Sequence, residues 1–259
     1  MRYSSFLSEL KGFSNLKKEW DLRNIRRLLS FLGNPEERLR IINITGTNGK
    51  GSVAVMLSSI LSEAGCRVGT YTSPHMDDFR ERFVVGGKRI SKRNLVRIYS
   101  KMRPFFSKFK GLSLFEISTA IALSYFAERK VGFAVLEVGM GGRLDATNVG
   151  PQELLIITNV ELDHTERLGN TVALIAREKA GLLRGKLLLT GETKPNALNE
   201  IRKACKRKNA KLVLERGSLD CRMRLKGEHQ KRNAALAARG AKLVLPKISA
   251  SAIRKGLSK

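Results

Sequence analysis

Residues 41–52 of this chain read IINITGTNGKGS, and the fold can be worked out from this stretch. Its isoleucines predict a buried strand over residues 40–45. A glycine-rich turn follows, and residues 52–64 then have the pattern of a helix that ends at Gly65, a residue typical of helix C-caps. Glycines allow backbone N–H groups to approach phosphates closely, and the first turn of a helix favours negative charge. The stretch therefore predicts a phosphate-binding loop between a strand and a helix.

Two polar side chains of this loop suit the chemistry of a nucleotide. Lys50 is expected to reach the β- and γ-phosphates, and the Ser52 hydroxyl is expected to reach Mg²⁺. The loop departs from the common phosphate-loop pattern, because Ile44 stands where the first glycine would be and Gly51 separates Lys50 from Ser52. A plain structural turn is not favoured, since the strand, the glycines, the lysine and the hydroxyl come in the right order. The predicted nucleotide-binding residues of the loop are Gly46, Thr47, Asn48, Gly49, Lys50, Gly51 and Ser52.

Short apolar runs alternate with helical patterns along the rest of the chain. Asn170 is an expected helix N-cap, and Trp20 is expected to anchor the first long helix in the core. The order of the elements predicts an α/β fold, with a mostly parallel sheet flanked by helices and ligands bound at the carboxyl ends of the strands. Strands are predicted at residues 133–138, 154–159, 186–190 and 211–214, and helices at residues 15–32, 171–180, 197–208 and 230–240.

Glu137 stands at the carboxyl end of one of these strands, directly before a glycine-rich turn at residues 139–142. A carboxylate at this edge of the sheet would face the phosphate loop, where Mg²⁺ bridges phosphate oxygens. We therefore expect Glu137 to be a magnesium ligand rather than a surface charge.

Several motifs of the chain resemble those of the folylpolyglutamate synthases and dihydrofolate synthases, a branch of the Mur ligase superfamily. They are GTNGKGS at residues 46–52, LGNPE at 32–36, YTSPHM at 71–76, FRER at 79–82, GMGGRLDATN at 139–148, LDH at 162–164, REKAG at 177–181, LKGEHQ at 225–230 and NAA at 233–235. The resemblance runs from about residue 16 to the end of the sequence, although residues 192–224 form a shorter stretch than the family has. It implies the phosphate-loop fold of the Mur ligase central domain over residues 1–259.

The resemblance also implies a first magnesium site and a folate-side loop. The family's magnesium-ligating serine falls on Ser73, which would join Ser52 and Glu137 around the ion. Phe115 and Glu116 match a pair that lies near the pterin substrate in relatives, but from the residues alone they could equally be a packed ring and a capped carboxylate. The substrate-binding residues implied in this way are Ser73, Pro74, His75, Arg82, Phe115 and Glu116.

A second magnesium site is implied at His164 and Lys179. Imidazole suits Mg²⁺ less well than oxygen ligands do, so Asp163 remains an alternative to His164. Lys179 alone would be interpreted as a solvated helix lysine, but the family's matching lysine is carbamylated, which turns a cation into an anionic oxygen ligand. The resemblance therefore implies catalytic roles for Lys50, His164 and Lys179. It also makes Asn233 the expected hydrogen-bonding partner of the adenine base.

The implied activity is ATP-dependent amide ligation. ATP would phosphorylate a carboxylate of dihydropteroate or a folate, and the amine of glutamate would attack the acyl phosphate. The relatives' C-terminal domain, which contributes to the glutamate site, is expected to be absent from these 259 residues, so a separate C-terminal domain chain is a further expected partner. Two alternatives remain open: a non-catalytic nucleotide- or nucleic-acid-binding remnant, and another Mur-type amide ligase, which the loop at residues 72–75 argues against.

The composition adds a strong positive charge, with 49 Lys and Arg against 23 Asp and Glu, a formal net charge of +26. Three interpretations stay open: a lineage-wide compositional bias, attraction of acidic ligands such as ATP or a polyglutamate tail, and nucleic-acid binding. No apolar stretch is long enough to cross a bilayer, and no signal peptide is recognised, so we expect a soluble cytoplasmic protein with no membrane partner. Cys66, Cys205 and Cys221 fit neither a zinc site nor a disulfide framework.

Overall fold

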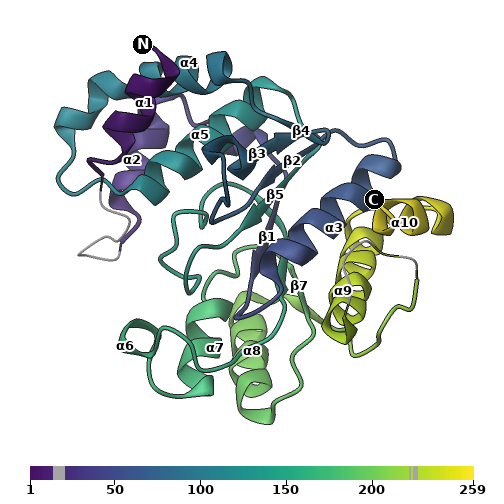
Figure 1. The fold of residues 1–259 in the computed structure, drawn as a ribbon. Helices are drawn as coiled ribbons and strands as arrows, with labels where there is room; N and C mark the ends of the chain where they lie inside the picture. Colours follow the sequence, from purple (N-terminus) through teal and green to yellow (C-terminus); the bar gives the residue numbers. More distant parts are fainter. Residues whose placement is uncertain (14–20, 222, 224–226) are drawn as a thin grey trace.

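The computed structural model describes residues 1–259 apart from 14–20, 222 and 224–226, and its centre is one eight-stranded sheet (Figure 1). The strands are β1 (Ile41–Thr45), β2 (Val68–Tyr71), β3 (Phe83–Val85), β4 (Lys88–Arg89), β5 (Phe133–Glu137), β6 (Gln152–Ile157), β7 (Leu187–Thr190) and β8 (Lys211–Leu214). Their order across the sheet is β4-β3-β2-β5-β1-β6-β7-β8. All neighbouring pairs from β2 to β8 are parallel, and only β3 and β4 join antiparallel. The predicted α/β fold with a mostly parallel sheet is confirmed.

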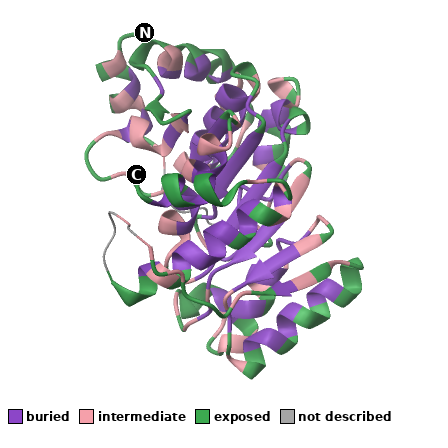
Figure 2. Cartoon of the chain, turned by 90° about the vertical axis from the view of Figure 1, so that its right-hand side faces the viewer, coloured by how far each residue is buried: buried purple, intermediate pink, exposed green. Residues whose placement is uncertain are grey.

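Helices cover both faces of this sheet, as Figure 1 shows. They are α1 (Tyr3–Leu10), α2 (Arg23–Phe31), α3 (Lys50–Glu63), α4 (Lys92–Met102), α5 (Leu114–Glu128), α6 (Thr165–Leu168), α7 (Val172–Ala180), α8 (Pro195–Lys208), α9 (Glu228–Val244) and α10 (Ala250–Leu257). Side chains alternate across a strand, so Ile42 and Ile44 pack with α3, α9 and α10, whereas Ile41 packs with α2, α4 and α5 on the opposite face. On that second face, α7 and α8 pack against β6 and β7. The central strands are therefore buried between two helical layers whose outer sides are exposed (Figure 2).

Several predicted boundaries were wrong by a few residues, and two of the shifts have a clear local cause. The helix after the phosphate loop begins at Lys50 rather than Ser52, because Gly49 takes the left-handed conformation that ends the turn. The strand predicted at residues 154–159 is β6, which ends at Ile157. The N-cap of α7 is Thr171 rather than Asn170, since the Thr171 hydroxyl accepts a hydrogen bond from the Leu174 N–H. Of the helix predicted at residues 15–32, α2 is observed, and Trp20 lies outside the described residues.

The most apolar segment of the chain, around residues 115–127, forms helix α5. Every residue from Glu116 to Phe126 in this helix is buried, because α5 packs between the sheet and the helices α2 and α4. Among the described residues, no helix is both long enough and apolar enough to cross a membrane. The apolar run is therefore a core helix.

Candidate active site

The phosphate loop joins the end of β1 to the start of α3 and depends on two glycines. A Cβ atom on Gly46 would lie 1.8 Å from the Thr158 Oγ1, and a Cβ on Gly49 would lie 2.5 Å from the Asn233 Oδ1. Both glycines also have positive φ angles, +149° and +79°. The Lys50 ammonium donates hydrogen bonds to the carbonyl oxygens of Gly46 (3.1 Å) and Thr47 (2.9 Å). The predicted loop is therefore present, with its lysine folded over it.

The segment that follows β6 fixes this loop from one side. The Thr158 hydroxyl donates to the Asn48 carbonyl over 2.7 Å, and the Asn48 N–H donates to the Asn159 Oδ1 over 2.9 Å. The Thr47 N–H donates to the Asn159 carbonyl. Sequence reasoning placed Thr158 and Asn159 inside a strand and missed this role. The signal that could have revealed it is a pair of polar residues at the carboxyl end of an apolar strand.

Glu137 brings the folate-side loop and the phosphate loop together. Its carboxylate is buried, with the residue 6% exposed, and accepts a hydrogen bond from the Ser73 N–H over 3.0 Å. A Cβ atom on Gly51 would lie 3.4 Å from both carboxylate oxygens. Burial raises the pKa of Glu137, so an ionised carboxylate here favours a nearby cation. The oxygens of Glu137, Ser73 and Ser52 are the hard ligands that Mg²⁺ prefers, so these residues fit the ion.

Lys179 lies under the phosphate loop rather than in solvent. It is 3% exposed, and its Nζ donates to the Gly46 carbonyl over 2.9 Å. Burial, followed by the charge of Lys50, lowers the pKa of Lys179 to about 8. The interpretation of Lys179 as a solvated helix lysine is therefore wrong.

His164 and Asp163 lie in the exposed loop before α6. The His164 Nε2 is 3.6 Å from the Asp163 Oδ1, and the charge of Asp163 acts on Lys179. Within the described residues, no three His, Cys, Asp or Glu side chains cluster as a metal site. A second metal ion here would therefore need oxygens from phosphate or from a modified lysine as well.

A cavity of about 370 Å³ lies on the folate side of Glu137. Five of the six predicted substrate-binding residues line it, and the sixth, His75, accepts a hydrogen bond from the Arg82 Nε over 3.0 Å. Burial, together with the charge of Arg82, lowers the pKa of His75, so its ring is neutral at neutral pH. The lining residues are Asp21, Ser73, Pro74, Arg82, Ser113, Leu114, Phe115, Glu116, Gly139, Met140, Leu144, Asp145 and Ala146.

Phe115 and Glu116 combine the two interpretations given to them. The Glu116 Oε2 accepts hydrogen bonds from the Ser113 N–H and hydroxyl, both 2.9 Å, in a capping box that starts α5. A Cβ atom on Gly139 would lie 2.7 Å from the Phe115 ring. The ring is therefore packed and the carboxylate is capped, while both residues line the 370 Å³ cavity.

A second cleft, of about 770 Å³, opens on the other side of the phosphate loop. It is lined by Asn48, Gly49 and Ser52 of the loop, by residues after β6 and β7, and by Asn233 of α9. The Asn233 Nδ2 donates to the Gln230 Oε1 over 3.0 Å. This cleft has the position expected for the base and ribose of a nucleotide whose phosphates lie on the loop.

Asp78 holds the loop that carries Ser73 and His75. Its carboxylate accepts hydrogen bonds from Arg80 (2.6 Å) and from the Tyr3 hydroxyl of α1 (3.2 Å). Arg80 lowers the pKa of Asp78, so ionisation stabilises the folded state above the ordinary carboxyl pKa, and this stabilisation is lost as the pH falls below about 4.

Asp78→Asn should lower the free energy of unfolding at pH 7 by about 1–2 kcal/mol and by less at pH 3. Urea denaturation at both pH values measures this, with the exposed Asp77→Asn as control, and an equal loss at both pH values would contradict it.

Comparison with known proteins places these features in context. A family model described as the Mur ligase middle domain matches residues 44–189. A probable bifunctional folylpolyglutamate synthase/dihydropteroate synthase of Haloferax volcanii is 38% identical, with 98% of this chain and 34% of that protein aligned. A dihydrofolate synthase/folylpolyglutamate synthase of Bacillus subtilis is 37% identical over 92% of this chain and 64% of that protein. A solved FPGS–AMPPCP–folate complex superposes with a TM-score of 0.94 at 31% identity, covering 100% of this chain and 72% of that one. The chain therefore spans only part of the length of each relative, from 34% to 72%.

Proposed function

Because this chain belongs to the folylpolyglutamate synthase and dihydrofolate synthase family of Mur ligases, we propose that it takes part in ATP-dependent ligation of L-glutamate to dihydropteroate or a folate. The observation that carries the proposal is the contact of Glu137 with both Ser73 and the start of α3. Glu137 therefore lies between the phosphate loop and Ser73, which lines the folate-side cavity, and this supports the proposal. The solved FPGS–AMPPCP–folate complex supports the same pairing of ligands. We propose the cytoplasm as the compartment.

The proposed chemistry begins with transfer of the γ-phosphoryl group of ATP to a substrate carboxylate, which gives an acyl phosphate and ADP. The amine of glutamate then attacks the acyl carbon, and phosphate leaves. Lys50 and the backbone N–H groups of the loop would hold the phosphates, and Arg82 presents a cation to the cavity where the acceptor would lie. Mg²⁺, held by Ser52, Ser73 and Glu137, would supply positive charge that stabilises the transferring group. A second ion at Lys179 and at His164 or Asp163, and an adenine contact from Asn233, belong to the same proposal.

Ligation of labelled glutamate tests this function. The 259 residues match 72% of the folate-bound relative, so we expect the chain to bind Mg-ATP by itself. We expect it to ligate slowly by itself, and faster when the unmatched portion of that relative is fused after Lys259. The reason is that an acyl phosphate must be shielded from water, which two-lobed ligases achieve by domain closure. Glu137→Gln in the fusion is the inactive control. Ligation by the 259-residue chain at about one turnover per second would contradict the expectation, and no glutamate-dependent product from either protein would contradict the function.

A further inference from the structure

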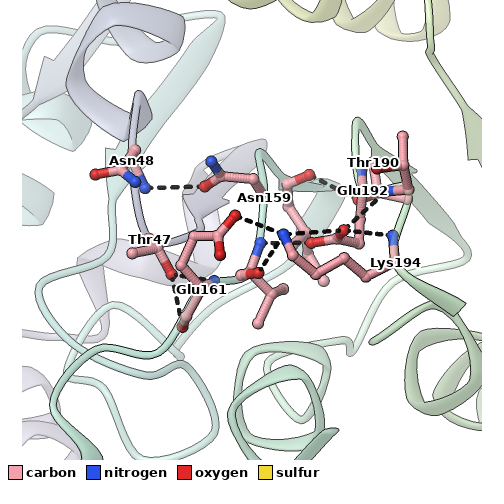
Figure 3. A network of polar contacts seen from close by, with 10 residues as sticks. Thr47, Asn48, Asn159, Glu161, Thr190, Glu192 and Lys194 are labelled. Carbon is pink, nitrogen blue, oxygen red and sulfur yellow. Dashed lines mark hydrogen bonds and ion pairs between the residues drawn. The ribbon is translucent and has the colours of Figure 1, made fainter. Parts of the chain in front are cut away.

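Both backbone polar groups of Val160 are held by one short segment that follows β7. The Val160 N–H donates to the Glu192 Oε2 over 2.6 Å, and the Val160 carbonyl accepts from the Lys194 Nζ over 3.1 Å. Figure 3 shows Glu192 and Lys194 beside the segment that contains Asn159 and Glu161. Val160 lies 32 residues before Glu192 in the sequence, so this contact joins two separate loops of the sheet edge.

Glu192 is itself fixed from several sides. The residue is 2% exposed, and its Oε1 accepts hydrogen bonds from the Thr193 and Lys194 N–H groups, both 2.7 Å. Its own N–H donates to the Thr190 hydroxyl, which in turn donates to the Ile157 carbonyl of β6. A buried carboxylate is costly unless its oxygens are satisfied, and here three N–H groups satisfy them. The carboxylate is therefore held rigidly by backbone N–H groups, at the edge of the 770 Å³ cleft that Glu192 also lines.

The segment held in this way carries the contacts to the phosphate loop. Asn159 binds Asn48 through its Oδ1, and the Glu161 N–H donates to the Thr47 hydroxyl over 2.9 Å. The Lys194 ammonium also pairs with the Glu161 carboxylate over 2.5 Å. Two residues after Glu161, the same segment reaches Asp163 and then His164. A shift of Val160 would therefore displace both the phosphate loop and the residues on the side of the second metal.

We propose that Glu192 and Lys194 are positioning residues for Mg-ATP, acting through Val160 on the phosphate loop and on the Asp163–His164 segment. This inference rests on the proposed function, which supplies the nucleotide and the metal. Removal of a partner that orients a metal-binding segment lowers metal affinity by roughly 10- to 100-fold in other proteins. The folate-side cavity is lined by other residues, so its ligand should be unaffected.

The test compares Glu192→Gln with Glu200→Gln. Glu200 is a matched control because it is also buried, with 5% of the residue exposed, and lies in α8, the helix that follows the Glu192 segment. Its carboxylate pairs with Arg177 and Lys203 and not with the segment that holds the phosphate loop. We expect Glu192→Gln to raise the Kd for Mg-ATP by roughly 10- to 100-fold, to speed amide hydrogen exchange at residues 159–164, and to leave folate binding unchanged. Glu200→Gln should change neither Mg-ATP binding nor amide exchange at residues 159–164, even if its melting temperature falls as far as that of Glu192→Gln.

Lys194→Met is the second variant, which removes the cation from the clamp. Because Lys194 also lines the 770 Å³ cleft, amide exchange at residues 159–164 separates loss of the clamp from loss of a direct contact with the nucleotide. Lys194→Met should raise the Kd for Mg-ATP and speed amide exchange less than Glu192→Gln does. Lys194→Arg should restore both quantities towards those of the parent. The inference is overturned if Lys194→Met and Glu192→Gln bind Mg-ATP as the parent does, or if Glu200→Gln loses as much affinity. If the parent chain fails to bind Mg-ATP, the proposed function fails. The exchange rates at residues 159–164 then still decide whether Glu192 holds this segment.

Discussion

Replacing Lys50 by alanine is expected to weaken Mg-ATP binding by roughly 1–3 kcal/mol, the range for lost charge-assisted hydrogen bonds. This corresponds to a roughly 5- to 150-fold higher Kd. Lys50 already donates hydrogen bonds to the carbonyls of Gly46 and Thr47, so it lies where a phosphate on the loop would meet it. Two effects therefore add in the variant: the loss of a cation beside the phosphates and a looser loop.

Isothermal titration calorimetry with Mg-ATP measures this change. Lys247→Ala is the control. Lys247 is an exposed cation in the connection between α9 and α10, and its replacement lowers the net charge by the same amount as Lys50→Ala does. The control should bind as the parent does. Equal nucleotide affinity in Lys50→Ala and the parent would contradict the assignment of the phosphate loop.

The central strands and the phosphate loop could be predicted because their signals are local. A run of isoleucines followed by glycines, a lysine and a serine specifies strand, turn and helix within residues 41–52. Glu137 could be placed beside them because the carboxyl ends of parallel strands meet at one edge of the sheet. The approach that this reasoning anticipated is that of Glu137 to the phosphate loop, where a Cβ atom on Gly51 would lie 3.4 Å from the carboxylate oxygens, whereas Ser73 was found through its motif.

The edge of the sheet and helix α5 were missed for two different reasons. Strands β3 and β4 have three and two residues, which is too short for an alternating pattern to appear. Helix α5 is apolar on all sides because it is buried on all sides, so it lacks the amphipathic period by which surface helices are found. Both were missed because the sequence pattern was weak.

The residues that fix the site were missed because their partners are distant in the sequence. Asn159 binds Asn48 across 111 positions, and Glu192 binds Val160 across 32. No local pattern marks a glutamate as the acceptor of three backbone N–H groups. Lys179 was found through a motif, but its burial could not be known before α7 was placed under the loop. Such contacts depend on how loops of neighbouring strands meet, which the fold alone determines.

Replacing Lys179 by alanine is expected to weaken binding of the second metal ion at least about tenfold. Lys179 is buried beside Lys50 and donates a hydrogen bond to the Gly46 carbonyl, and its burial together with the charge of Lys50 disfavours an ammonium group. With a pKa of about 8, a growing share of the amine is neutral as the pH rises from 7 to 9. A neutral amine can attack carbon dioxide, forming an N–C bond and releasing one proton, and a carbamate formed in this way at Lys179 would supply the anionic oxygens that a hard cation needs.

The measurement is a titration of Mg²⁺ or Mn²⁺ in the presence of ATP and bicarbonate. Lys179→Ala should bind the second ion at least about tenfold more weakly, the lower end of losses when an outer partner of a metal ligand is removed. A small carboxylic acid added to the variant should restore part of the binding, because it returns oxygens to the space left by the side chain. The control is Lys206→Ala, which removes an exposed cation of α8 and should behave as the parent does.

Intact mass and crystallography of the parent protein at saturating bicarbonate and magnesium give the decisive view. A bare Lys179 amine under those conditions would show that the second ion, if bound, takes its oxygens from Asp163 and the phosphates instead.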